Sequence, residues 1–252
     1  MGDAVVPDED PFYGTITVVG GGCYGSYYVR QLLRARDAGK LRWVGRLVVV
    51  DRNAECEASR RYGGDIVLAL EEWAPYFTSY LDGVAAAPEP HQRDAIVPSP
   101  LMPHLLFDWV VQRSRTRWPD RRVTCVPPAA VEGVPWQREG ADATRYVSFA
   151  TWTCPVNCIE PRICPHTKGE RTWSFPPTLT AHVEAERRAG RALEGPALFR
   201  CTHRAHGVGM IDVDEVLAAD RLVAAVGAHR AARVLVGTVS HCHGALGELA
   251  IE

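Results

Sequence analysis

Lysine is almost absent from this sequence of 252 residues: Lys40 and Lys168 are its two lysines, so nearly all of its basic charge is arginine. This leaves few candidates for Schiff-base chemistry, which needs a lysine amine. The chain also lacks a long run of charge of one sign, and its formal net charge is -2. We therefore expect small-molecule ligands, no nucleic-acid partner and no polybasic membrane anchor.

Long apolar runs and the start of a secretory signal peptide are missing as well. Residues 1–11 are acidic, and no later stretch is apolar for long enough to span a bilayer. These absences predict a cytoplasmic protein with no membrane partner. In that reducing compartment, the eight cysteines are better explained as metal ligands, reactive thiols or core residues than as a disulfide framework.

The order of apolar segments predicts an α/β fold. A Rossmann-like parallel sheet is expected in residues 1–128, followed by a C-terminal α/β segment, residues 129–252, that contains a cysteine-rich metal loop. The last third of the chain is again βαβ in style. Residues 127–143 are expected to form a linker or surface loop. The expected strands are residues 15–19, 47–50, 66–70, 95–97, 122–126, 146–152, 197–201 and 234–239, and the expected helices are residues 26–36, 71–81, 105–117, 179–189 and 213–226.

A glycine turn joins the first expected strand to the first expected helix. Its sequence is Gly20-Gly21-Gly22-Cys23-Tyr24-Gly25. Gly20, Gly22 and Gly25 fit the pattern G-x-G-x-x-G, in which the glycines permit a tight turn, close approach of a pyrophosphate and close helix–strand packing. Asp51 closes the next apolar strand, somewhat later in the chain than the usual spacing of about 20 residues.

Through these residues, about the first half of the chain resembles the Rossmann NAD(P)- and FAD-binding superfamily. The resemblance implies a dinucleotide whose phosphates lie at the helix N-terminus. An acid at Asp51 would accept hydrogen bonds from ribose hydroxyls and favours NAD, whereas Arg52 could instead meet the 2′-phosphate of NADP. FAD, S-adenosylmethionine and a turn that serves only packing remain open, and Cys23 is either a small filler or a redox group.

Three cysteines and a histidine lie within thirteen residues: Cys154, Cys158, Cys164 and His166. Soft thiolates select zinc and iron–sulfur clusters alike, and both commonly need four ligands. The fourth is expected from His166, Cys201 or Cys242, unless the position stays open for substrate.

The residues that follow Cys154 add a second resemblance. The order Cys-Pro-Val-Asn-Cys-Ile resembles the segment after a cluster-ligating cysteine in bacterial ferredoxins, although no C-x-x-C-x-x-C precedes it. A [4Fe-4S] cluster is the leading expectation, with zinc and the absence of any metal as alternatives.

Histidines follow two of the later expected strands. His203 follows the first, and His241 and His243 flank Cys242 after the second. If both strands belong to one parallel sheet, these loops share its carboxyl edge, where α/β proteins place their sites. The three histidines are therefore candidate acid/base groups or metal ligands, and the alternative for each is an ordinary surface or structural residue.

Together these features predict an NAD(P)-linked iron–sulfur oxidoreductase, or the nucleotide-binding subunit of a redox complex, that acts on a small molecule. A redox partner protein and an oligomer are both compatible with this reading. One alternative is a non-catalytic redox or nucleotide sensor, or a cluster-assembly protein. Another is an NAD(P)-dependent enzyme in which zinc only staples a loop.

Overall fold

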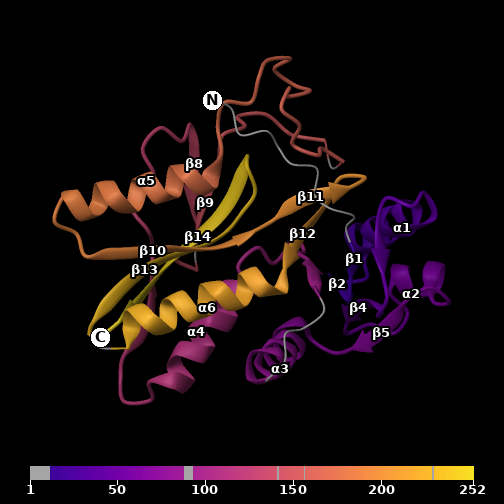
Figure 1. The fold of residues 1–252 in the computed structure, drawn as a ribbon, viewed down its shortest axis with the longest axis horizontal. Helices are drawn as coiled ribbons and strands as arrows, with labels where there is room; N and C mark the ends of the chain where they lie inside the picture. Colours follow the sequence, from indigo (N-terminus) through magenta and orange to yellow (C-terminus); the bar gives the residue numbers. More distant parts are fainter. Residues whose placement is uncertain (1–11, 88–92, 141, 156, 229) are drawn as a thin grey trace.

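The protein has a mixed α/β architecture with parallel and antiparallel strands (Figure 1). The structure is a computed structural model that describes residues 12–87, 93–140, 142–155, 157–228 and 230–252. Within these ranges two six-stranded sheets form the body of the molecule, and Phe12–Tyr13 (β1) and Arg42–Trp43 (β3) pair separately. The acidic stretch 1–11 lies outside the described residues.

The first sheet is built on four parallel strands that the sequence predicts. These parallel strands have the order β6-β2-β4-β5, so β2, which comes first in the chain, lies between β4 and β6, and the chain proceeds outward in both directions from it. β2, β4 and β6 are buried because their β-branched and apolar side chains are covered on both faces. The parallel strands are Ile16–Val19 (β2), Leu47–Asp51 (β4), Val67–Leu70 (β5) and Ala95–Val97 (β6), and the helices among them are Cys23–Asp37 (α1), Glu57–Tyr62 (α2) and Trp73–Ala86 (α3).

A hairpin from the C-terminal half completes this sheet. Thr202–Ala205 (β11) pairs with Val208–Asp212 (β12), and β12 pairs antiparallel with β6. The sequence analysis does not predict these strands, since their polar and glycine-containing residues lack a clear alternation. The predicted boundary at residue 128 therefore does not coincide with the division between the sheets.

The second sheet differs from the predicted βαβ style. Its order is β10-β13-β14-β9-β8, with β7 also on β14, and only the β10–β13 pair is parallel. The central strand β14 is missed from sequence because it is buried along most of its length and contains two glycines, so it shows no period-2 pattern. β8 arises inside the segment expected to be a loop. The strands are Val123–Val126 (β7), Trp136–Glu139 (β8), Arg145–Ser148 (β9), Leu193–Arg200 (β10), Ala232–Val239 (β13) and His243–Ile251 (β14).

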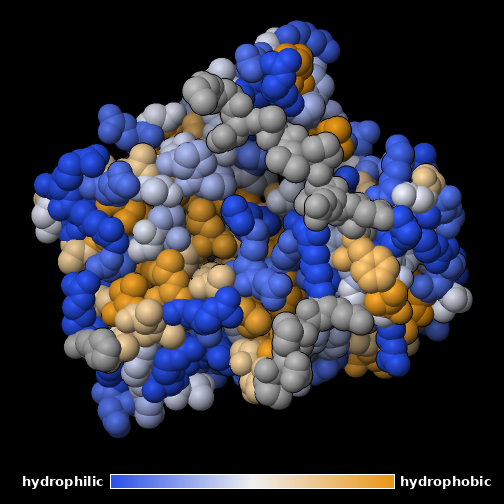
Figure 2. All heavy atoms as spheres, in the orientation of Figure 1, coloured by the Kyte–Doolittle hydropathy of each residue, from blue (hydrophilic) through white to orange (hydrophobic). Residues whose placement is uncertain are grey.

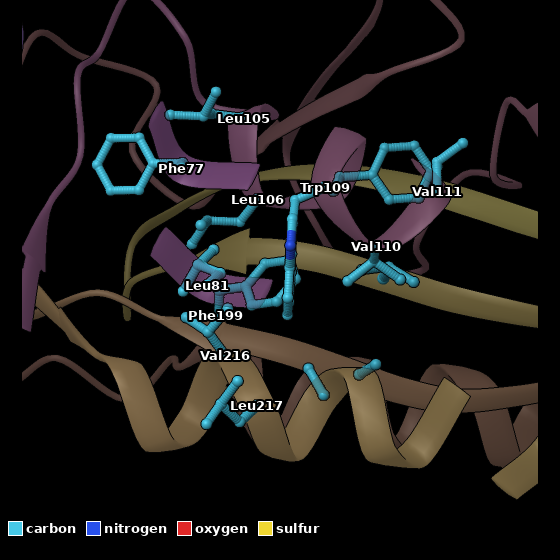
Figure 3. Close-up of a cluster of buried hydrophobic side chains, with 14 of the residues drawn as sticks. Phe77, Leu81, Leu105, Leu106, Trp109, Val110, Val111, Phe199, Val216 and Leu217 are labelled. Carbon is cyan, nitrogen blue, oxygen red and sulfur yellow. The ribbon is translucent and has the colours of Figure 1, made fainter. Parts of the chain in front are cut away.

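One hydrophobic core joins the two sheets. Leu105–Arg117 (α4), where a helix is predicted, and Val213–Gly227 (α6) contribute more of its buried side chains than any other two elements (Figure 3). Val50 from the first sheet and Phe199 from the second are both fully buried in it. Each such side chain contributes about 1.5–3 kcal/mol by its burial. The two sheets therefore share one core and form one packed unit.

Phe175–Arg188 (α5) covers the opposite face of the second sheet, where Phe175, Leu179 and Val183 pack on Leu235 and Leu246. On the face shown in Figure 2, apolar residues gather between α5 and α6, where a shallow groove crosses β10. Within the described part of the chain, no helix has the length and apolar character needed to cross a membrane.

Candidate functional site

The cysteine segment is an irregular stretch between β9 and α5, seen above the sheets in Figure 1. A tight turn shapes its second half: the backbone NH of Cys164 donates to the carbonyl of Gly169 over 2.9 Å, and that of Lys168 donates to the carbonyl of Cys164 over 2.9 Å. Lys168 has φ 59°. The closed turn fixes the position of Cys164.

Four cysteines line one small cavity. Three come from the segment, Cys154, Cys158 and Cys164, and the fourth is Cys242 from the turn between β13 and β14. His166 also lines this four-cysteine cavity, and its ring stacks on Trp152 with centroids 4.5 Å apart. Of the three predicted candidates for a fourth ligand, the fold brings Cys242 and His166 to the cavity and leaves Cys201 elsewhere.

Several N–H groups donate to these sulfurs. The backbone NH of Glu160 donates to Sγ of Cys158 over 3.4 Å, and the indole NH of Trp173 donates to Sγ of Cys242 over 3.3 Å. Hydrogen bonds from backbone NH groups at Thr167 and His166 lower the pKa of Cys164 despite some desolvation. Such bonds stabilise thiolates, which are the form that binds metals.

Cys154 and Cys242 favour the protonated thiol. Burial and the nearby Cys158 and Cys164 raise the pKa of Cys154, and burial raises the pKa of Cys242 to about 12. A bound cation would reverse this preference, because it deprotonates a coordinating thiol.

The donor set of four thiols and one imidazole is one that thiolate-binding metals use. Among the residues that the structure describes, no three cysteine, histidine or acidic side chains form a group arranged to hold a metal ion. The void between the four cysteines is about 10 Å³, room for about one water-sized group.

Glu160 connects the cysteine segment to the β13–β14 turn. This buried carboxylate accepts hydrogen bonds from Oγ of Ser240 at 2.7 Å, the NH of His241 at 2.8 Å and the NH of Cys242 at 3.2 Å. Burial alone would raise its pKa, but the Ser240 hydrogen bond and the nearby His203 imidazole lower it. The sequence analysis does not single out Glu160, because an acid in a polar loop gives no sign of being buried.

His203 and His243 line a second cavity of about 360 Å³, called here the histidine cavity. Nδ1 of His203 lies 3.7 Å from Oε2 of Glu160. Burial lowers the pKa of both imidazoles, with a partial offset from Glu160, so both are neutral at neutral pH. His241 does not line this cavity, and its Nδ1 lies 2.8 Å from Oγ of Ser174.

The hydrogen bonds of Ser148 assign the tautomer of His243. The Ser148 hydroxyl donates its one proton to the carbonyl of Ala150 over 2.7 Å, and its oxygen lies 3.0 Å from Nδ1 of His243. Nδ1 must then be the donor in that contact, which leaves Nε2 of His243 as a proton acceptor.

The histidine cavity lies at the carboxyl edge of the first sheet. One wall is Tyr28 of α1 together with Pro98, Ser99 and Pro100, which follow β6, and the opposite wall comes from β13 and β14. This is the point at which the chain order reverses between β2 and β6. Cys201, a predicted metal-ligand candidate, belongs to this cavity instead.

The glycine turn has the geometry that its sequence predicts. Gly20 adopts φ +84°, and a Cβ on Gly25 would stand 1.8 Å from the carbonyl oxygen of Gly20. The NH of Gly21 donates to Oδ2 of Asp51 over 2.7 Å. A Cβ on Gly22 would meet nothing within 4 Å, so open space faces this residue at the start of α1.

The remaining predicted residues of this region lie at the surface. Cys23 and Tyr24 begin α1 and are exposed, and Nη1 of Arg52 lies 3.3 Å from Oε1 of Glu72 in an exposed ion pair.

Fold and site together define a two-sheet α/β protein with a four-cysteine cavity beside a histidine cavity. Residues 106–252, more than half of the chain, match the family AF_1314_C, described as "Uncharacterized protein, C-terminal domain", and the chain belongs to this family. The matched region includes all four cysteines of the cavity together with Glu160, His203 and His243. Neither the curated proteins nor the solved structures contain a match to the chain.

Proposed function

We propose that this protein is an NAD(P)-linked oxidoreductase, or the nucleotide-binding subunit of one, in which the four cysteines bind an iron–sulfur cluster. The observation that carries the proposal is the contact between the two cavities. Glu160 lines the four-cysteine cavity and approaches His203 of the histidine cavity, and Ser240 lines the histidine cavity two residues before Cys242. A reaction in the histidine cavity would therefore take place next to the metal bound by the four cysteines.

The topology of the first sheet supports the proposal that the protein binds a dinucleotide. Its parallel strands have the order of one half of the Rossmann fold, with the glycine turn after the central strand and an acid at the end of the next. Open doubly wound sheets bind ligands where the strand order reverses, and the histidine cavity lies at that point. A dinucleotide held by its phosphates at Gly22 would extend along this edge toward His203 and His243.

Asp51 favours NAD over NADP. Its carboxylate accepts hydrogen bonds from the NH of Gly21 and the NH of Asn53, and a carboxylate has about four acceptor positions, so it can still receive ribose hydroxyls. Arg52, the candidate partner for a 2′-phosphate, pairs with Glu72 instead.

The protein's own residues would manage protons and exclude water at the reacting end. A bound nicotinamide supplies or accepts hydride there. Nε2 of His243 is the acceptor available for a proton from a substrate hydroxyl, because Nδ1 is engaged by Ser148. Pro98, Pro100 and Pro103 line the cavity, and because proline has no backbone NH, they donate no hydrogen bonds to a ligand.

The ligands of the cluster would be Cys154, Cys158, Cys164 and Cys242, with the NH groups of Glu160 and Trp173 donating to their sulfurs. A thiolate-bound cluster supplies single-electron transfer, and N–H bonds to its sulfurs tune its potential. The electron partner would be a second protein or the nucleotide, and since each NADH supplies two electrons and each cluster accepts one, one NADH would reduce the clusters of two chains.

The experiment is metal and sulfide analysis of protein purified without oxygen, followed by addition of NADH. We expect iron with acid-labile sulfide, a broad absorption band near about 400 nm, and loss of that band when NADH is added. Iron without any spectral response to bound NADH would reject the electron-transfer role and leave a sensor or cluster-assembly protein.

A second candidate follows from the small void between the cysteines. About 10 Å³ suits one ion better than a four-iron cluster. In this case zinc would hold the cysteine segment against the β13–β14 turn, and the reaction would be carried out by NAD(P) and the histidines. Stoichiometric zinc, no colour and activity that survives oxidation in air would support it over the iron–sulfur form.

A further inference from the structure

Neutral side chains make up the described part of the histidine cavity's wall. Among the described residues that line it, none is Asp, Glu, Lys or Arg. Its polar groups are the hydroxyls of serine, threonine and tyrosine, the thiol of Cys201 and the two imidazoles. A cavity that orients its ligand with neutral groups leaves a carboxylate or phosphate without a cationic partner, and desolvating an unpaired charge is costly.

The carboxylate of Glu160, next to His203, adds a negative charge close to this cavity. Oε2 of Glu160 lies 3.7 Å from Nδ1 of His203. If His203 gains a proton, the resulting cation already faces Glu160, so it offers little net attraction to an anionic ligand. The Ser240 hydroxyl, which also lines the cavity, donates its proton to the same carboxylate.

The rest of the wall is apolar and rigid. Three prolines of the loop after β6 line the cavity together with Val239 and Ala245 of the second sheet, and Tyr28 and Tyr146 add aromatic surface. At about 360 Å³ the cavity lies within the range of small-molecule sites, which combine apolar walls with a few orienting polar groups.

We propose that the histidine cavity binds an uncharged, largely apolar molecule that presents a single alcohol, carbonyl or amide oxygen to His203 and His243, and that it rejects carboxylates and phosphates. This inference rests on the proposed function, because it names the class of molecule that would react with the nicotinamide.

The test is ligand-observed NMR on the full chain with probes matched in shape and different in charge. One pair is benzyl alcohol and benzoate, and the other is cyclohexanone and cyclohexanecarboxylate. We expect the neutral member of each pair to bind at least tenfold more tightly. Equal or tighter binding of the anions, or no binding by either neutral probe, would overturn the inference.

A charge added to the wall gives a second readout. Tyr146→Arg places a cation at the cavity, so the preference should move at least tenfold toward benzoate, while the matched variant Tyr146→Phe should keep it. Pro100→Arg, at an exposed position of the opposite wall, serves the same purpose if Tyr146→Arg does not fold. An unchanged preference in a folded arginine variant would show that the probes bind elsewhere and would contradict the proposal.

A separate measurement of NADH binding, by the fluorescence of NADH, distinguishes failure of the proposed function from failure of this inference. If the neutral probes bind more tightly than the anions but the protein does not bind NADH, the proposed function is rejected and the inference stands. NADH binding together with equal affinity for both charge classes would do the reverse.

Discussion

Glu160 holds Cys242 in place across 82 residues of sequence: its Oε1 accepts a hydrogen bond from the backbone NH of Cys242 over 3.2 Å. The same carboxylate binds Ser240 and the NH of His241, so the whole β13–β14 turn is attached to the cysteine segment through one side chain. Glu160 itself adopts φ 48°, an unusual conformation for a residue with a Cβ. The fourth cysteine of the cavity thus depends on a residue that is not a cysteine.

Replacing Glu160 by glutamine should detach this turn. The amide offers one acceptor oxygen where the carboxylate has two, and its NH₂ would face backbone donors. We expect a loss of about 2–3 kcal/mol in the free energy of unfolding and a clear fall in bound metal. Urea denaturation and metal analysis measure both.

Glu170→Gln is the matched control, because Glu170 lies in the same segment and forms an exposed ion pair with Arg162 at 2.8 Å. Its stability should change by less than about 1 kcal/mol and its metal content should not change. Equal behaviour of the two variants would refute the role of Glu160.

The four-cysteine cavity predicts which cysteines retain metal. Serine at Cys154, Cys158, Cys164 or Cys242 should reduce the bound metal to below about half of the unaltered level, because loss of one thiolate from four opens the site. Cys201→Ser should leave the metal content unchanged, since Cys201 lines the histidine cavity. Metal analysis of the five purified variants decides this, and loss of metal from Cys201→Ser would contradict the assignment.

Local patterns in the sequence predict the parallel strands of the first sheet well, although they miss β11 and β12. The strands at 15–19 and 47–50 and the helix at 105–117 match β2, β4 and α4, because buried β-branched runs and a proline before a helix are signals carried by neighbouring residues. The glycine turn was predicted for the same reason.

The second sheet and the grouping of side chains depend on long-range contacts that no local pattern encodes. β14 pairs with β7, β9 and β13, and its Gly247 is required because a Cβ there would stand 2.6 Å from the ring of Phe107. Cys201 and Cys242 are indistinguishable as sequence candidates, and only the position of each strand end decides which cavity each reaches. His241 and His243 are separated by one residue yet face different surroundings for the same reason.

Asp212 should make the stability depend on pH in the acid range. Burial alone would raise its pKa, but hydrogen bonds and charges from Arg204 and Arg93 outweigh burial and lower it. Its pKa in the folded protein is thus below the unfolded value of about 3.9, so its stabilisation is present above about pH 4 and is lost as the pH falls through the folded pKa.

Asp212→Asn should cost about 2–3 kcal/mol at pH 7 and less at pH 3, below the unfolded pKa of about 3.9, where the unaltered protein has begun to lose the same stabilisation. Thermal unfolding from pH 3 to pH 7 tests this. Asp214→Asn, at an exposed position in the first turn of α6, should shift stability by about 0.5 kcal/mol or less. A constant difference between Asp212→Asn and the unaltered protein at every pH would contradict the argument.

Gly22 and Gly25 of the glycine turn should separate the effect on folding from the effect on nucleotide binding. Gly25→Ala places a Cβ 1.8 Å from the Gly20 carbonyl oxygen, so the turn must move, and we expect a loss of about 2–4 kcal/mol. Gly22→Ala meets open space at φ -70°, so its stability should fall by about 1 kcal/mol or less. If a pyrophosphate approaches the backbone there, Gly22→Ala should still weaken NADH binding at least tenfold, or about 1.4 kcal/mol. Calorimetric titration of NADH into both variants, compared with their unfolding curves, is the measurement. A Gly22→Ala protein that is stable and binds NADH with unaltered affinity would place the nucleotide away from this turn.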